Sequence, residues 1–206
     1  NGGWDVFIQK LTSSGNLVWA KSFGGISTDI ATSISVDASG NVYTTGYFQG
    51  TVDFDPGSGT VNLTSNGGSD VFIQKLTSSG NLVWAKSFGG TSNDEAASIS
   101  VDASGNVYTT GNFAGTADFD PGSGTVNLTS NGGYDVFVQK LTSSGNLVWA
   151  KSFGGSSTDK GASISVDASG NVYTTGYFYG TVDFDPGSGT VNLTANGWSN
   201  VFVQKL

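Results

Sequence analysis

Three near-identical copies of one 65-residue unit make up almost the whole chain. The copies occupy residues 1–65, 66–130 and 131–195, and residues 196–206 repeat the opening of the unit once more. A fixed period of this length is typical of repeat architectures, in which each unit buries its apolar faces against its neighbours. The sequence therefore predicts a single repetitive domain, 1–206, that ends in an extra strand.

The composition limits the classes of function. The 206 residues carry a formal net charge of −8, with eight basic and sixteen acidic side chains. Phosphate binding needs a basic face, so a nucleic-acid partner is disfavoured. No stretch approaches the roughly 18 consecutive apolar residues of a membrane-spanning helix, which argues against membrane insertion. The acidic balance, with its abundant Gly, Ser, Thr and Asn, favours a secreted or cell-surface bacterial protein.

Each unit is predicted to be all-β. Runs rich in Val, Ile, Phe, Tyr, Trp and Thr are separated by turn residues at regular intervals, the pattern of short antiparallel hairpins. The first hairpin is apolar in both alternation phases, so both of its faces should be covered, whereas the third alternates and should have one wet face. The three predicted hairpins of the first unit are Asp5–Thr12 with Asn16–Phe23, Ser33–Ala38 with Asn41–Phe48, and Thr51–Phe54 with Thr60–Thr64.

These residues resemble a bacterial β-propeller repeat family that is often described from seven-bladed members. The resemblance implies antiparallel four-stranded blades and an extracellular bacterial protein without known catalysis. The segment Gln49–Ser65 departs from the family pattern and adds an outer hairpin to the usual blade. The motif consists of Asp5-Val6-Phe7-Ile8-Gln9-Lys10-Leu11, Ser14-Gly15-Asn16, Trp19, Phe23-Gly24-Gly25, Asp29, Ile34-x-Val36-Asp37, Gly40-Asn41-Val42-Tyr43 and Gly46.

Three units are too few to close a ring, because propellers have about four to eight blades. Either the chain is part of a longer array, or copies from several molecules complete a ring, or the units stack openly and polymerise. The terminal strand, 196–206, has two interpretations: it caps the third unit, or it exchanges into the equivalent slot of another chain. The residues of the predicted assembly strands are Val6, Ile8, Val201, Phe202 and Val203.

The side chains argue against an enzyme. The chain has no histidine or cysteine, so thiol and histidine-based catalysis are absent. Paired aspartates in the outer hairpin suggest a calcium site, since residues i and i+2 of a strand share a face. The alternative is a turn cap with surface charge, because aspartate before Pro-Gly is a common turn opener. The aspartates concerned are Asp53, Asp55, Asp118, Asp120, Asp183 and Asp185.

Aromatic residues that differ between the copies are candidates for a ligand or partner surface. They lie at strand ends and in loops, where exposed functional residues concentrate. Carbohydrate is the ligand that such side chains would stack against. These candidates are Trp4, Tyr47, Tyr134, Tyr177, Tyr179 and Trp198.

The sequence as a whole predicts a non-catalytic extracellular structural module that self-associates into a ring or filament, with adhesion among its expected roles. A glycan-binding, lectin-like propeller is the alternative function.

Overall fold

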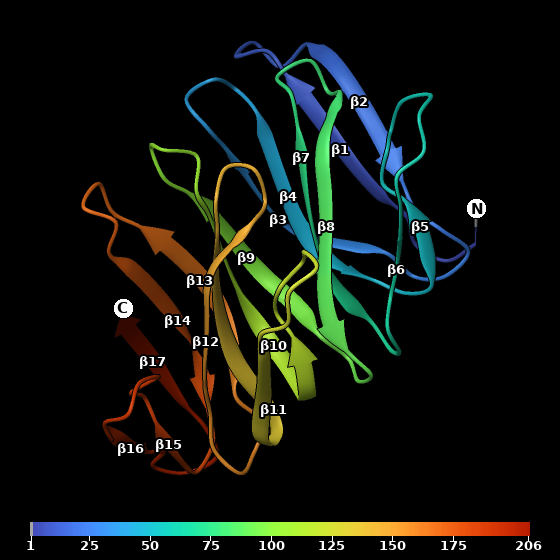
Figure 1. The fold of residues 1–206 in the computed structure, drawn as a ribbon. Helices are drawn as coiled ribbons and strands as arrows, with labels where there is room; N and C mark the ends of the chain where they lie inside the picture. The colour runs from blue at the N-terminus through green and yellow to red at the C-terminus, as the bar shows by residue number, and fades with distance from the viewer. Residues whose placement is uncertain (1) are drawn as a thin grey trace.

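Residues 2–206 fold into consecutive antiparallel blades with no helix. The computed structural model describes residues 2–206. Figure 1 shows the blades following one another from the N-terminal strands in blue to the C-terminal strands in red. The two ends of the array do not meet, so the described chain forms an open arc of blades. The prediction of an all-β repeat fold is confirmed.

Two complete blades lie in the middle of the array, and partial blades flank them. The N-terminal half-blade pairs β1 (Val6–Leu11) with β2 (Leu17–Phe23). The first complete blade has the order β3 (Ile30–Val36), β4 (Val42–Phe48), β7 (Asp70–Leu76) and β8 (Leu82–Gly90). The second has the order β9 (Glu95–Val101), β10 (Val107–Asp118), β11 (Asn127–Leu141) and β12 (Leu147–Phe153). The last blade contains β13 (Lys160–Val166), β14 (Val172–Phe178) and β17 (Asn200–Lys205).

Each complete blade straddles a boundary between sequence units. Its two inner strands come from one unit and its two outer strands from the next, as in β3 and β4 followed by β7 and β8. The inner strand β9 contacts both β3 and β13, which places these three strands side by side near the axis of the array. The N-terminal half-blade therefore holds only outer strands, and the last blade lacks its outermost strand.

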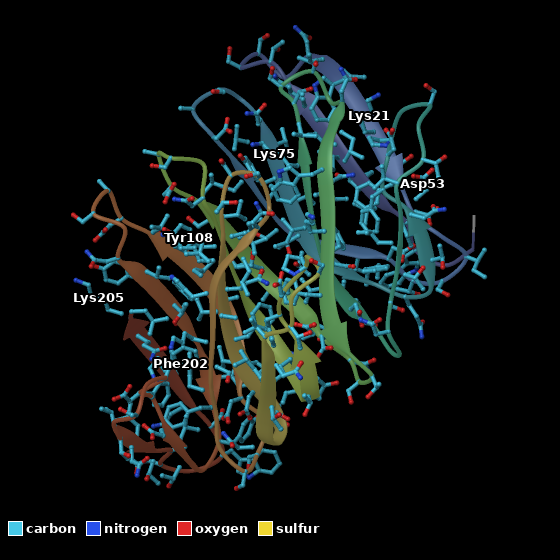
Figure 2. The ribbon with its side chains drawn as sticks, viewed as in Figure 1. Lys21, Asp53, Lys75, Tyr108, Phe202 and Lys205 are labelled. Atoms are coloured by element: carbon cyan, nitrogen blue, oxygen red, sulfur yellow. The ribbon has the colours of Figure 1, made fainter. Side chains whose placement is uncertain are left out.

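An outer hairpin extends each unit, as the extra segment predicts. These hairpins are β5 (Thr51–Asp53) with β6 (Asn62–Thr64), and β15 (Thr181–Asp183) with β16 (Asn192–Thr194). In the middle unit the same hairpin is formed by the ends of β10 and β11, where Thr116 pairs with Thr129. Figure 2 shows Asp53 on the first of these hairpins.

The core is a series of aromatic clusters between blades. Phe72 is fully buried and packs beside Phe23 and Phe54, with ring centroids 5.6 and 5.2 Å away. Phe137 has the same surroundings one unit later, against Phe88 and Phe119. Because each cluster draws side chains from successive blades, neighbouring blades stabilise each other by burial of apolar area.

Candidate functional site

Two apolar faces at the ends of the array are exposed, although their counterparts inside it are buried. Phe7 is 74% exposed, whereas Phe72 and Phe137 at the same position of the later units are fully buried. Val201 shows the same contrast: it is 76% exposed, whereas its counterparts Val71 and Val136 are fully buried. The difference comes from neighbours, because the local sequence is the same.

We name the exposed group Phe7, Ile34 and Val36 the N-terminal face, and the exposed pair Val201 and Val203 the C-terminal face. The two faces are the two halves of an interface that the array already contains. Inside the array, the residues equivalent to the C-terminal face are Val71 and Ile73. They lie in one core cluster with Ile99 and Phe137, which are equivalent to Ile34 and Phe7 of the N-terminal face. Val101, the equivalent of Val36, packs against the same cluster. Each end of the chain thus presents a surface that is complementary to the other end.

Strand edges at the two ends are also unpaired. β7 pairs with β4 on one side and β8 on the other. Among the described strands, β1 has only β2 as a partner and β17 has only β14. In the isolated chain the terminal strand therefore caps the third unit. An unpaired strand edge is a template for pairing with another chain.

The five predicted assembly residues fall into two groups. Val201 and Val203 lie on the C-terminal face. Val6, Ile8 and Phe202 are buried against the neighbouring blade of the same chain, each only 3% exposed. Sequence reasoning missed Phe7, Ile34 and Val36; for Phe7 the signal is that the strand 5–11 is apolar in both alternation phases, so that each of its faces needs a neighbouring blade.

The paired aspartates of the outer hairpins act as turn caps in the structure. Asp53 Oδ1 accepts hydrogen bonds from the backbone N–H groups of Asp55 and Val61, at 3.0 and 2.8 Å. Asp55 Oδ1 accepts one from the N–H of Gly57 at 2.8 Å. The same bonds recur in the later units at Asp118 and Asp183. A calcium ion here would compete with these donors, and calcium binding at these residues stays a prediction.

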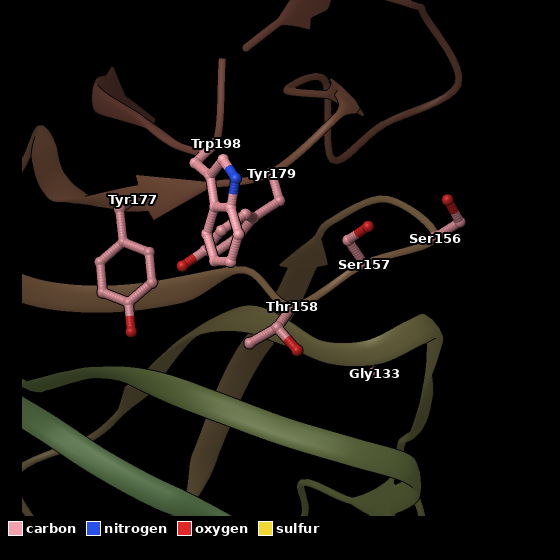
Figure 3. Close-up of a pocket in the computed structure, with 7 residues that line it drawn as sticks. All are labelled: Gly133, Ser156, Ser157, Thr158, Tyr177, Tyr179 and Trp198. Carbon is pink, nitrogen blue, oxygen red and sulfur yellow. The ribbon is translucent and has the colours of Figure 1, made fainter.

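Three of the six candidate aromatic residues converge on one open cavity. Tyr177, Tyr179 and Trp198 line a cavity of about 640 Å³ together with Ser156, Ser157, Thr158 and Gly133. Figure 3 shows these lining residues, among which the rings of Tyr177 and Tyr179 have centroids 6.0 Å apart and Ser156, Ser157 and Thr158 supply hydroxyl groups. Trp198 is 90% exposed, so the cavity presents an aromatic surface and several hydroxyl groups to the solvent.

The other three candidates lie elsewhere. Trp4 lines a separate cavity with Phe7 and Ile30. The Tyr134 ring lies under the Lys160 ammonium, 5.1 Å from the ring centroid, and Tyr47 is half-buried in β4. The three residues therefore do not contribute to the cavity at Trp198.

Pairs of aspartates that the sequence did not single out as a site are buried at the junctions between units. Asp70 and Asp94 are each 1% exposed, as is Asp135, and Asp159 is fully buried. Burial raises the pKa of Asp70, Asp94 and Asp135 to about 6 in each case. Asp70 contributes to the raised pKa of Asp94 through charge repulsion. The molecule thus holds negative charge in poorly hydrated positions, which needs compensation.

Comparisons with known proteins show what the repeat is similar to. The SBBP family model, described as a beta-propeller repeat, matches residues 18–47, 83–112 and 148–177. An uncharacterised WD repeat-containing protein of Acanthamoeba polyphaga mimivirus is 27% identical over 226 residues, covering 95% of this chain and 16% of that protein. The regulatory protein FlaEY of Caulobacter vibrioides is 27% identical over 172 residues, covering 82% of this chain and 18% of that protein. The chain therefore spans less than a fifth of the length of these relatives.

Within the described residues, no helix is long and apolar enough to cross a membrane. The repeat family and the WD-repeat relative indicate an interaction module in general terms.

Proposed function

Because the chain is built from β-propeller repeats, we propose that it is a non-catalytic module whose partner is a second copy of itself. The hairpin β1–β2 of one copy joins β13 and β14 of another and takes the place of β17. Two inner strands and two outer strands then form one complete blade, the arrangement already present in β3, β4, β7 and β8. Two chains joined at both ends make a ring, and unclosed joining makes a filament.

The observation that carries the proposal is the contrast in exposure between identical residues. Phe7 and Val201 are exposed at the ends, and the same residues are fully buried where a neighbouring blade is present. In the joined blade Phe7 takes the position that Phe202 has beside β14, and Val6 and Ile8 take the positions of the displaced Val201 and Val203. Burial of an aromatic or branched side chain stabilises by about 1.5–3 kcal/mol.

The two competing strands have nearly the same sequence. Val201-Phe202-Val203-Gln204-Lys205 corresponds to Val6-Phe7-Ile8-Gln9-Lys10. In the slot beside β14, Gln204 Nε2 donates to the Phe184 carbonyl at 2.6 Å, and Gln74 Nε2 donates in the same way to Phe54 at 2.7 Å. Gln9 can therefore make the contact that Gln204 makes. The exchange replaces β17 by the equivalent strand β1, which carries its outer neighbour β2 with it. Such an exchange of equivalent strands is a low-cost route to association.

A disulfide between chains tests the exchange directly, since the chain has no native cysteine. Tyr173 pairs with Lys205 across β14 and β17, and Lys10 is the counterpart of Lys205. The double variant Tyr173→Cys, Lys10→Cys should form disulfide-linked chains, seen on non-reducing gels. The control Tyr173→Cys, Lys205→Cys should close within one chain, because directly opposite residues have Cβ atoms about 5 Å apart.

Light scattering with size exclusion, followed by electron microscopy, supplies the second readout. A dimer or a filament is expected, and Phe7→Asp, at a residue that is exposed in the single chain, should return the protein to a monomer because its charge would be buried in the junction. Val191→Asp, at an exposed valine next to the outer hairpin strand β16, is the matched control. A monomer at every concentration, with no disulfide between chains, would refute the proposal.

Secretion or display on a bacterial cell surface is part of the same proposal. It is supported by the acidic composition, which is rich in Gly, Ser, Thr and Asn. Protease treatment of intact cells that carry the protein checks it: a surface protein is removed, whereas an internal one is protected.

Carbohydrate binding is a second candidate function, favoured by the convergence of Tyr177, Tyr179 and Trp198 on one cavity. Aromatic rings accept the C–H face of a sugar, and the hydroxyl groups of Ser157 and Thr158 are suited to its oxygen atoms. Exchange of β17 would move Trp198, so this site belongs to the chain before exchange.

Saturation-transfer NMR with free galactose, glucose and N-acetylglucosamine tests this second function on dilute protein. Trp198→Gly and Tyr179→Ala install residues found at the same positions of other units, Gly133 and Ala114. Each should remove the signal, and the control Trp4→Ser should keep it. Absence of transfer to wild-type protein from all three sugars, and from a wider glycan array, would end the carbohydrate hypothesis.

A further inference from the structure

The buried aspartate pairs at the unit junctions point to a cation site that is separate from the end faces and from the aromatic cavity. In the middle of the array the pair is Asp70, the first residue of β7, and Asp94, the residue before β9. Both are almost completely buried. Across residues 2–206, no lysine is among the groups that influence the pKa of either one. The pair is therefore not neutralised by a basic side chain.

One oxygen of Asp70 has no hydrogen-bond partner among the residues that the structure describes. Its Oδ2 accepts hydrogen bonds from the Asn66 backbone N–H at 3.1 Å and from Asn66 Nδ2 at 3.2 Å. Its Oδ1 is buried without a partner, and the same is true of Oδ1 of Asp135 in the next unit. A buried polar atom that lacks a partner in two copies of one site calls for an explanation, such as an ion or a water.

The free oxygen faces the other carboxylate of the pair across Gly89. A Cβ atom placed on Gly89 would lie 2.8 Å from Asp70 Oδ1 and 2.9 Å from Asp94 Oδ2. Both oxygens thus border one small space that a side chain would fill. Asp94 is fixed in position, because its Oδ2 accepts a hydrogen bond from the Gly90 N–H at 2.6 Å and its Oδ1 accepts one from the Ala114 N–H at 3.2 Å.

We propose that Asp70 Oδ1 and Asp94 Oδ2 bind a divalent cation, Ca²⁺ in the first place. Calcium prefers carboxylate and carbonyl oxygens and tolerates flexible geometry, and two carboxylates match its charge. No group of three or more acidic, histidine or cysteine side chains in the described residues is placed to hold a metal. The remaining ligands are therefore carbonyl groups and water.

The three units should differ in affinity. Glu95 follows Asp94, and its charge adds to the negative potential at that carboxylate. The corresponding residue is Lys160 after Asp159 and Ile30 after Asp29. A cation should therefore bind most tightly at Asp70 and Asp94, and less tightly at Asp135 and Asp159, where a positive charge lies close by.

The cation would join the start of a blade strand to the loop that leads into the next blade. Asp70 begins β7 of one blade, and Asp94 precedes β9 of the following blade. Ligand binding to the folded state alone raises its stability by mass action. Calcium should therefore act as a stabiliser of the array without changing its fold.

Calcium chloride alone is the probe, added to the full chain at pH 7.5 against an EDTA reference. At a hundredfold excess over its dissociation constant, one site should raise the melting temperature by about 5–10 °C. Isothermal titration should show one tight site. Asp70→Asn with Asp135→Asn should remove both effects; asparagine is the natural residue at the equivalent position Asn200, so the strand accepts it.

Two further variants locate the ion. Asp53→Asn with Asp118→Asn leaves the junction pairs intact and should keep the full calcium response, whereas Glu95→Lys should weaken the tight site at least about tenfold through charge alone. Wild-type protein with neither heat nor a shift in melting temperature in millimolar Ca²⁺ or Mg²⁺ would overturn the proposal. So would a response that survives Asp70→Asn with Asp135→Asn but is lost in Asp53→Asn with Asp118→Asn. Should the first variant fail to fold, Gly89→Ala gives the same decision, because its Cβ would lie 2.8 Å from Asp70 Oδ1 and 2.9 Å from Asp94 Oδ2 and fill the space for the ion; an unchanged calcium heat in this variant would overturn the proposal.

Discussion

Phe7 and Phe72 occupy the same position in two copies of the unit, and replacing each by alanine should change the free energy of unfolding by very different amounts. Phe72 is fully buried, with its ring beside Phe23 and Phe54. Phe72→Ala removes these contacts and leaves a cavity, so we expect a loss of about 3–5 kcal/mol in the free energy of unfolding. Phe7 is 74% exposed, and Phe7→Ala in dilute protein should therefore lose no more than about 1 kcal/mol.

Urea denaturation followed by circular dichroism measures both values, with Phe137→Ala as a second buried copy that should match Phe72→Ala. The comparison controls for local sequence, because the flanking residues are the same. Where the protein associates, the loss for Phe7→Ala should increase, since the N-terminal face becomes buried. Equal losses for Phe7→Ala and Phe72→Ala in the dilute monomer would show that the N-terminal face is already covered, and would refute the reasoning about the two ends.

Three other predictions concern the aspartates. In EDTA, the pKa of Asp94 in the folded protein, about 6, lies above its value in the unfolded chain, about 3.9. This difference contributes about 3 kcal/mol to the free energy of unfolding below pH 4, and the contribution is lost as the pH rises through 6. Other carboxyl groups, such as Asp37, have lowered pKa values and change the stability in the opposite direction. The test is therefore the difference in urea midpoint between wild type and Asp94→Asn, measured at pH 4.5 and at pH 7.5. An equal difference at both pH values contradicts the prediction for Asp94. Gly89→Ala should destabilise by about 1–3 kcal/mol in thermal melts, because its Cβ would lie 2.6 Å from Asp70 Cγ; an unchanged melting temperature would mean that the space is larger. Asp53→Ala should lose about 1 kcal/mol, since two backbone N–H groups lose their acceptor, whereas Asp53→Asn keeps an acceptor and should melt near wild type; calcium protection that requires Asp53 would instead support the metal hypothesis at that turn.

The strands and turns of this protein follow from short stretches of sequence. Alternating apolar residues and glycine-containing turns place the hairpins within a few residues of where the structure has them, for example β4 (Val42–Phe48) against the expected Asn41–Phe48. Asp37 closes the turn between β3 and β4, because its Oδ1 accepts hydrogen bonds from the N–H groups of Ser39 and Asn41, each at 2.9 Å. These features depend on neighbours in the chain, which the sequence shows directly.

The candidate sites were only partly predictable. Tyr177, Tyr179 and Trp198 stood out as variable aromatics, but their convergence on one cavity depends on how β14 and the segment before β17 lie in space. The pairing of Asp70 with Asp94 had no local signal, because the two residues come from a strand start and a loop that only the packing of successive blades brings together. Contacts between residues distant in the chain cannot be read from the periodicity of one unit.

The sequence by itself determined the repeat, the hairpins, the added outer hairpin and the absence of histidine and cysteine chemistry. Only the tertiary structure decided which copies of a residue are buried, that blades cross the boundaries between units, and that the two ends present complementary faces. The physical reason is that local conformation depends on residues near in sequence, whereas burial and charge compensation depend on whichever blade lies alongside. Phe7 and Phe72 have the same local sequence and differ because only Phe72 has a blade packed against it.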